Sequence, residues 1–183
     1  MTTSPQSQQQ VQIKSYPAPS ALATLTDLKP EEVQAVSEAI NPLIADTFAL
    51  YTKTKNYHWH AAGSHFRDYH KLFGRQAEDM LASIDILAER VRRIGGTTIR
   101  SISHISQLQT IQADNSDFVQ AGEMARRLME DNKHMAQMQR AAHEVCVHNH
   151  DVATASVLEN LIDQSERRTW FLFETVQGMN NTD

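Results

Sequence analysis

Apolar side chains recur every three or four residues along most of the chain, which is the spacing of an amphipathic α-helix. The pattern is most regular in the second quarter of the sequence, where it includes Phe66, Tyr69, Phe73, Ala77, Met80, Ile84, Leu87, Val91 and Ile94. Ser64 is placed to cap this helix, and the pair Gly95-Gly96 follows its basic last turn. The stripe therefore predicts one long helix that stops at the glycine pair.

A helical pattern also precedes this stripe, from Pro30 to about Ala61. Pro30 suits the first turn of a helix, but Pro42 lies inside the pattern. Because an internal proline removes a backbone hydrogen bond, the sequence predicts either a kinked helix or two helices, with Asn41 capping the second. Gly63 separates this pattern from the next.

Two further helical patterns lie in the second half of the chain. One opens at Ser116 and continues to about Val145, and the other runs from about Asp151 to about Gln177. The connector before Ser116 exceeds a tight turn, and its apolar spacing predicts a short helix over residues 101–108. Together these elements predict an all-α fold, the ferritin-like four-helix bundle, with a short helix in the long crossover between helices 2 and 3.

The ends of the chain are expected to lie outside this bundle. Residues 1–28 are rich in Gln, Ser, Thr and Pro, and they carry too little apolar surface to offset the entropy cost of ordering. We therefore predict a flexible N-terminal tail over residues 1–28, unless it orders against a neighbouring subunit. The bundle is predicted over residues 29–178, followed by a C-terminal tail over residues 179–183.

Composition and charge narrow the classes of protein to which the chain can belong. The formal net charge of -5 gives no overall attraction to nucleic acid. No apolar run approaches the roughly 20 residues that span a bilayer, and the N-terminus has no signal-peptide pattern. Cys146 is the one cysteine, so an internal disulfide is excluded. We expect a cytoplasmic protein without a membrane partner.

An acidic pair stands within the most regular helix. Asp85 and Glu89 lie four residues apart, so both side chains project from one face. Such a pair is most often a solvated edge, with Glu89 paired to Arg92 or Arg93. Carboxylates at this spacing are also suited to bind a metal ion, and the sequence leaves both interpretations open.

Two histidines flank the predicted turn at Gly63. His58 lies near the end of the first helix and His70 early in the second, so antiparallel helices would bring them together. A single helical histidine is usually only a polar or packed residue, but imidazole with carboxylate ligands and open positions suits iron. The chain contains no Glu-x-x-His motif, so a conventional di-iron site inside one bundle is not expected.

These motifs together resemble the Dps family of miniferritins. The resemblance rests on the segments KNYHWH (55–60), GSHFRDYH (63–70) and IDILAER (84–90), followed by the glycine pair. It extends from about residue 30 to 177, and the later segments resemble the cyanobacterial branch in particular.

The resemblance implies a hollow dodecamer that oxidises Fe(II), preferentially with hydrogen peroxide, stores the ferric mineral and so protects against oxidative stress. It also implies ferroxidase sites at two-fold interfaces, where two histidines of one subunit meet an acidic pair of its neighbour. Carried over, His58 and His70 would face Asp85 and Glu89 of the partner subunit as the catalytic and metal-binding residues. One bundle alone would then lack a complete ligand set.

One position departs from the family pattern, because Gly74 stands where the family has a further acidic residue. Glu78, one turn further along the same face, could replace that ligand directly or through water. Alternatively, His60 or His65 could shift the coordination toward nitrogen, or the second iron position could be weak. The number of irons per site therefore stays open, and a nitrogen-rich site would also suit Zn.

The aromatic residues beside His58 have two interpretations. Trp59 and Tyr57 could donate electrons to stray oxidants near the site. Packing in the core or in an interface is at least as common a role for such residues.

Acidic residues of the last helix are candidates for an iron-uptake pore. Asp151, Glu159 and Asp163 are spaced by eight and four residues, so they are predicted to share a face. The resemblance implies acidic three-fold channels in the shell, and a solvated face is an equal alternative.

A further group of metal-binding side chains surrounds the turn before the last helix. Thiolate and imidazole suit zinc or copper, but the spacing matches no closed zinc motif. We therefore favour a structural role for His143, Cys146, His148 and His150.

DNA binding gives the family its name but needs several cations on the protein, because affinity scales with the number of phosphate contacts. In relatives that bind DNA, tails rich in lysine and arginine commonly carry the contact. This end of the chain contains only Lys14 and Lys29, so we predict weak or absent DNA binding. The alternative to a ferroxidase is a non-enzymatic shell or nucleoid-associated, DNA-protecting protein with a weakened metal site.

Overall fold

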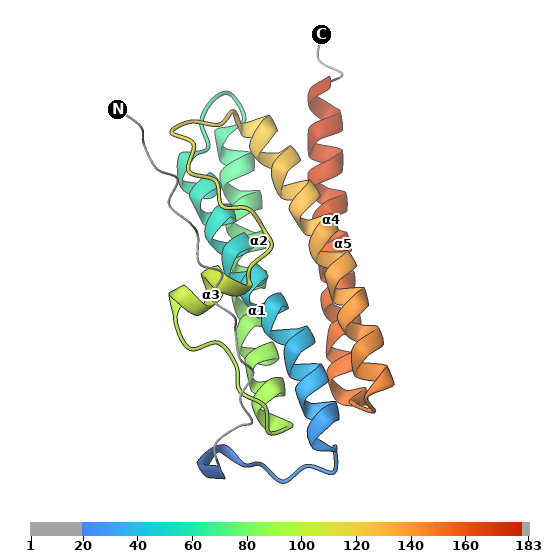
Figure 1. Cartoon of the computed structure of the whole chain (residues 1–183). Helices are drawn as coiled ribbons and strands as arrows, with labels where there is room; N and C mark the ends of the chain where they lie inside the picture. Colours follow the sequence, from blue (N-terminus) through green and yellow to red (C-terminus); the bar gives the residue numbers. More distant parts are fainter. Residues whose placement is uncertain (1–19, 181–183) are drawn as a thin grey trace, which may run out of the picture.

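The computed structural model describes residues 20–180, and residues 1–19 and 181–183 lie outside the described part (Figure 1). Over the described residues the regular elements are all helical, and they run in the order η1 Ser20–Leu22, α1 Pro30–His60, α2 Phe66–Arg93, α3 Ile102–Leu108, α4 Ala121–His148 and α5 Val152–Asn180. The all-α prediction is therefore confirmed. Most of the predicted N-terminal tail falls in the part that is not described.

The four long helices form two antiparallel hairpins, α1 with α2 and α4 with α5, that pack side by side (Figure 1). A long crossover leads from the end of α2 back across the bundle to the start of α4, and α3 within it packs on α1. This is the predicted topology, a four-helix bundle with a short helix in the crossover.

Pro42 lies inside α1, which continues as one helix from Pro30 to His60. The two-helix alternative is therefore wrong. Asn41, which would have capped a second helix, instead donates a side-chain hydrogen bond of 2.9 Å to the carbonyl oxygen of Thr97. The packing of α1 against the other long helices and the crossover outweighs the loss of the one backbone hydrogen bond that proline removes.

Two predicted helix starts are wrong by a few residues. At the start of α2, Ser64 makes no cap, because the chain turns once more and His65 takes the capping position. At the start of α4, Ser116 lies in a turn where its backbone N–H donates to Asp114 Oδ1 at 2.9 Å, and the helix begins only at Ala121. In both cases a local turn holds the residue that resembled a cap.

The predicted stripe of α2 forms one side of the core. Its members are buried from Tyr69 to Ile94, and only Phe66, at 45% exposure, lies at the surface. Opposite them pack the fully buried side chains of the other long helices, Ile40, Leu43, Ile44, Leu50, Met124, Leu128, Met135 and Leu158. The methionines among them are packed as apolar core residues.

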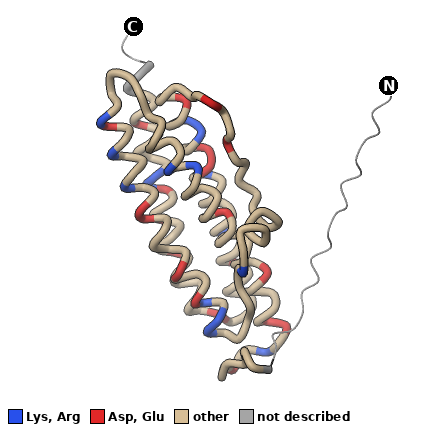
Figure 2. Tube along the Cα trace, turned by 90° about the vertical axis from the view of Figure 1, so that its left-hand side faces the viewer, with Lys and Arg blue, Asp and Glu red and all other residues tan. Residues whose placement is uncertain are grey.

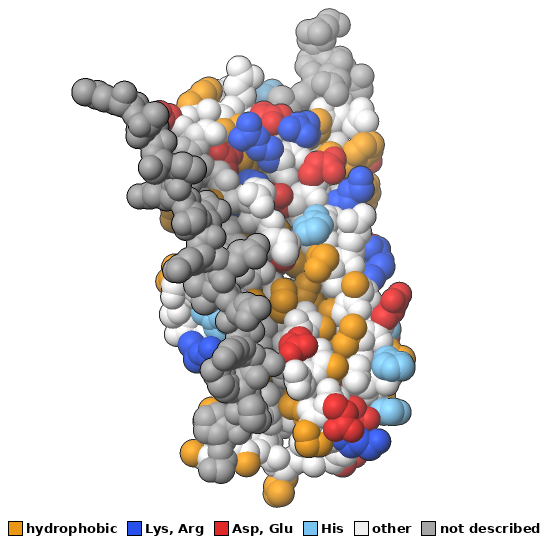
Figure 3. Space-filling view, in the orientation of Figure 1, with side chains coloured by type: hydrophobic (Ala, Val, Ile, Leu, Met, Phe, Trp, Pro, Cys, Tyr) orange, Lys and Arg blue, Asp and Glu red, His pale blue; other side chains and the backbone are white. Residues whose placement is uncertain are grey.

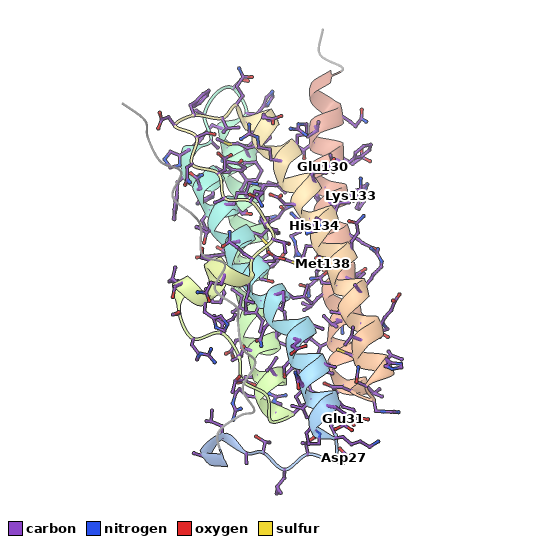
Figure 4. All side chains as sticks on the ribbon, viewed as in Figure 1. Asp27, Glu31, Glu130, Lys133, His134 and Met138 are labelled. Atoms are coloured by element: carbon purple, nitrogen blue, oxygen red, sulfur yellow. The ribbon has the colours of Figure 1, made fainter. Side chains whose placement is uncertain are left out.

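Two buried carboxylates attach the long crossover to the bundle. Asp46 of α1 accepts hydrogen bonds from the backbone N–H groups of Thr110, at 2.5 Å, and Ile111, at 2.9 Å. His134 reaches from α4 to the hydroxyl of Thr110, at 3.0 Å (Figure 4). The crossover is thus held by side chains of both hairpins.

The second carboxylate, Asp114, lies in the crossover itself. It accepts a short hydrogen bond from the hydroxyl of Tyr57. It also forms an ion pair with Arg127, with 2.6 Å between Arg127 Nη1 and Asp114 Oδ2. The hydrogen bond from Tyr57 is the main cause that holds the pKa of Asp114 well below its usual range, and Ser116 and Arg127 add to it. Burial raises the pKa of Tyr57 above its usual range.

Across residues 20–180, no helix is both long and apolar enough to cross a membrane.

Asp114→Ala should destabilise the fold by about 1–3 kcal/mol, because it leaves the buried Tyr57 hydroxyl without its acceptor. The pKa of Asp114 is lowered in the folded state, so its contribution is present above the ordinary value of 3.8 and is lost as the pH falls below it. Thermal unfolding of the two proteins from pH 7 to pH 3 measures this. The difference should shrink at the acid end, and in a Tyr57→Phe background it should be smaller at pH 7. An equal difference at both ends of the pH range would contradict the assignment.

Candidate metal-binding site

The ends of α1 and α2 that meet at the Gly63 turn bring His58 and His70 into direct contact. Their rings stack with 3.8 Å between centroids and 24° between planes. Nδ1 of His58 lies 2.6 Å from the carbonyl oxygen of His70, and Nδ1 of His70 lies 2.9 Å from the carbonyl oxygen of His58. The predicted approach of the two histidines is therefore observed, and each ring is bound by the backbone of the other residue.

These reciprocal hydrogen bonds decide which ring nitrogen is available for a metal ion. A carbonyl oxygen can only accept, so each Nδ1 must carry the proton. In the neutral imidazole, Nε2 then keeps its lone pair, which is the form that binds a metal. A histidine ligand held through its other nitrogen by a carbonyl is also fixed in orientation. Both imidazoles are thus prepared as Nε2 donors.

The acidic pair lies elsewhere on the same helix. Asp85 follows His70 by fifteen residues, which at the rise of an α-helix is a separation of about 22 Å. Asp85, Glu89 and Glu78 are all exposed on α2. Within the described residues of one chain, no three histidine, cysteine or acidic side chains lie close enough together to hold a metal ion. The histidine pair and the acidic pair are therefore separate groups within one subunit.

Glu89 forms an ion pair with Arg93, one of the two partners expected from the sequence. Both side chains are more than half exposed. Exposed pairs of this kind contribute little stability, so the carboxylate stays free to exchange partners.

The two aromatic residues beside His58 differ sharply in environment. Tyr57 is buried against Phe73 and holds Asp114, so it has a structural role. Trp59 is 63% exposed and lies under the ammonium group of Lys55, which is 5.6 Å from the ring centroid. Of these two residues, Trp59 alone is exposed.

Several large apolar side chains of α2 are exposed. Phe66 stands one turn before His70, with 5.1 Å between their ring centroids. Leu81 and Ile86 of α2 are each about half exposed, and Leu81 precedes Asp85 in the helix whereas Ile86 follows it. Because Leu81 and Ile86 are five residues apart, they project from different sides of the helix and do not form one continuous patch.

The interior of the bundle carries a positive charge. Arg168 of α5 is 7% exposed and donates hydrogen bonds to Asn132 Oδ1, at 2.7 Å, and to Ser165 Oγ, at 2.8 Å. Burial lowers its pKa to about 10, so it remains charged at neutral pH. Arg168 was not predicted from the sequence as a buried residue, although its spacing from Leu161 and Leu172 places it on the apolar stripe. A buried cation makes this interior unfavourable for a metal ion.

The group around the last turn does not form one site. Cys146 is fully buried, whereas His148 is exposed. His143 faces Glu159, at 3.4 Å, and His150 faces Glu32, at 3.0 Å. These side chains point to different neighbours, as the structural interpretation requires.

The three acidic residues proposed for a pore do not share one surface. Asp151 is 4% exposed, pairs with Arg90 at 2.8 Å and accepts from the backbone N–H of Thr154 at 3.0 Å. It caps α5, so its side chain turns back onto the helix end, whereas Glu159 and Asp163 project into solvent. The predicted common face therefore holds for Glu159 and Asp163 and is wrong for Asp151.

Comparisons with known proteins agree with this architecture. The model of the ferritin-like domain matches residues 37–181. An uncharacterized low temperature-induced protein of Nostoc sp. is 33% identical over 159 residues, covering 84% of this chain and 85% of the relative. The DNA protection during starvation protein 1 of Deinococcus radiodurans is 27% identical over 153 residues, covering 84% and 74%. The chain belongs to the Dps family of miniferritins.

The Dps fold is also found among solved structures. The Dps protein of Vibrio cholerae, described as a member of a broad superfamily of ferritin-like diiron-carboxylate proteins, matches with a TM-score of 0.79 at 24% identity. The match covers 85% of this chain and 97% of that protein. At this identity the likeness shows the Dps fold, and the Nostoc relative supports the resemblance to cyanobacterial members.

Cys146 should be inert toward thiol reagents in the folded protein. Burial raises the pKa of this thiol to about 12, so only about one molecule in ten thousand carries the thiolate at pH 8. Reaction with a chromogenic disulfide at pH 8 should be slow until denaturant is added, and then complete. Full modification of the folded protein within minutes would contradict the burial.

Proposed function

We propose that this Dps protein is a ferroxidase that oxidises Fe(II), preferentially with hydrogen peroxide, at sites shared between subunits, and stores the ferric product in a hollow dodecamer. The observation that carries the proposal is the histidine pair, whose hydrogen bonds hold both Nε2 atoms ready as ligands. Two imidazoles with carboxylates and open positions form a ligand set that suits iron.

The sharing of sites between subunits follows from the distance within one chain. Among the residues that the structure describes, no carboxylate lies close enough to His58 and His70 to complete a metal site, and Asp85 and Glu89 stand about 22 Å and about 28 Å beyond His70 along a straight helix. In an isologous two-fold dimer, an antiparallel neighbour places its own acidic pair against the histidines, and the arrangement repeats symmetrically. Leu81, half exposed on α2 between His70 and Asp85, suits such an interface.

Iron is the substrate of this reaction. Two Fe(II) ions each give one electron to hydrogen peroxide, the O–O bond breaks, and two protons complete the formation of two water molecules and two Fe(III). Because the peroxide takes both electrons, no hydroxyl radical is released. Gly74 supplies no ligand, so Glu78, exposed on the same face of α2, is the proposed source of a further carboxylate. Zn(II) would compete for the same nitrogen donors.

Two neighbouring features complete the proposal. Trp59, exposed and next to His58 in the chain, is the proposed electron donor to an oxidant that escapes the site. Glu159 and Asp163, exposed together on α5, are the proposed lining of an iron-uptake pore, without Asp151. The proposed setting is the cytoplasm, where the shell would limit oxidative damage.

The double variant His58→Ala/Glu89→Ala should lose at least about 10-fold in the rate of Fe(II) oxidation, because metal sites depend strongly on each ligand. The measurement is the absorbance of the ferric product after peroxide is added to anaerobic protein and Fe(II). The matched control is His148→Ala/Glu144→Ala, which removes an exposed histidine and glutamate from the far end of α4. A rate that is equal in the two variants would move us to the non-enzymatic alternative.

Mixing the two single variants tests the sharing of sites. In a dimer of one His58→Ala chain and one Glu89→Ala chain, one site lacks both residues and the other is intact. Random reassembly of equal amounts should therefore restore about one quarter of the wild-type rate. If both residues served one site within a single chain, the mixture would stay as inactive as its components.

DNA binding should be weak or absent at an ionic strength of about 150 mM. On the face shown in Figure 3 the basic side chains are interspersed with acidic ones, and Figure 2 shows the same mixture along the helices. Where carboxylates alternate with the cations in this way, few phosphates can be neutralised. An electrophoretic mobility assay checks this, and a clear shift of linear duplex DNA at that salt concentration would contradict it.

A further inference from the structure

Gly74 is buried in the interior of α2, one turn after His70. A Cβ atom built at this position would lie 3.0 Å from Cε1 and 3.1 Å from Nδ1 of His58. Both distances are tighter than ordinary carbon contacts, so a side chain at residue 74 and the observed ring position compete for one space. The edge of the His58 ring lies where that side chain would be.

The path of the hydrogen bond explains why the ring lies there. In an α-helix the backbone N–H of residue 74 points to the carbonyl oxygen of residue 70. That same oxygen accepts the 2.6 Å hydrogen bond from His58 Nδ1. A ring that reaches this carbonyl from outside the helix must therefore pass close to the α-carbon of residue 74.

The ring has little freedom to move away. One face of His58 stacks on His70, with 3.8 Å between the ring centroids. His70 is in turn held by its own hydrogen bond to the His58 carbonyl and by contact with Phe66. A displacement of the His58 ring would disturb both reciprocal hydrogen bonds at once.

We propose that Gly74 is a positioning residue, whose missing side chain lets His58 and His70 stack and direct both Nε2 atoms toward the metal ion. The role of the pair in iron oxidation rests on the function proposed above, but the steric relation between Gly74 and His58 does not. It follows that a side chain at residue 74 would compete with the observed position of the His58 ring. The chain must therefore draw its acidic ligands from Asp85, Glu89 and Glu78.

The sign of a stability change tests the proposal. Alanine is a better helix former than glycine, so Gly74→Ala would stabilise α2 if nothing opposed it. With His58 present, we expect Gly74→Ala to lower the melting temperature. In a His58→Ala background, where the ring is gone, the same substitution should raise it. This double-mutant cycle isolates the coupling between the two residues.

A rise in melting temperature in both backgrounds would overturn the proposal, because the ring would then have given way without cost. If Gly74→Ala does not fold, a folded double variant would support the proposal. An unfolded double variant would overturn it, since the damage would not come from His58.

Binding of Zn(II), measured by calorimetry on the assembled protein, gives the second readout. Gly74→Ala should weaken it by about 10- to 100-fold, as expected when the group that orients a ligand is disturbed. His58→Ala provides the reference for loss of the ligand itself. Unchanged Zn(II) affinity in Gly74→Ala would overturn the positioning role. A wild-type protein that fails to oxidise Fe(II) would leave both tests readable, so the two proposals fail separately.

Discussion

Two histidines that each hydrogen-bond the backbone of the other form the constraint around which this subunit is organised. The exchange joins the last turn of α1 to the first turns of α2, so it closes the hairpin as well as orienting the rings. It requires the tight turn at Gly63, whose φ of 104° is accessible mainly to glycine, and the bare helix surface at Gly74. Local backbone geometry and the chemistry of the site therefore depend on the same few residues.

The remainder of the chain keeps this arrangement rigid. The long crossover could move freely over the bundle, but Asp46 and Asp114 attach it at two points. Asp114 binds Tyr57, the residue directly before His58, so the crossover also restrains the helix that carries the histidine. The core beneath is continuous, and its buried Arg168 is satisfied by Asn132 and Ser165. We infer that the proposed metal site is held by the bundle as a whole.

Much of this architecture could be predicted from the sequence because helical periodicity is a strong signal. The stripe of α2 predicted the buried face almost residue by residue, and the pairing of His58 with His70 followed from antiparallel helices across Gly63. Helix starts were less predictable, since Ser64 and Ser116 have the chemistry of caps but are engaged in local turns. Asp151 was misplaced for the same reason, because a residue at a helix end can turn its side chain back.

The features that sequence could not show depend on tertiary contacts. Nothing in the spacing of His58 and His70 predicts that each ring binds the opposite carbonyl. Gly74 looked like a lost ligand, and its contact with His58 became visible only in three dimensions. Arg168 stands in an apolar stripe where charge is rare, and only its buried hydrogen bonds account for it.

The distance between the histidine pair and the acidic pair has a consequence for the assembly of the protein. A newly synthesised chain carries its nitrogen ligands at one place and its oxygen ligands at another. Under the proposed arrangement, a single chain would therefore not oxidise iron. Iron oxidation would begin only when two folded subunits associate. The mineral would then form only where the protein shell already surrounds it. Dilution would stop the reaction because the subunits would dissociate by mass action. A misfolded subunit could not complete a site. Under the proposed arrangement, iron oxidation would therefore depend on assembly.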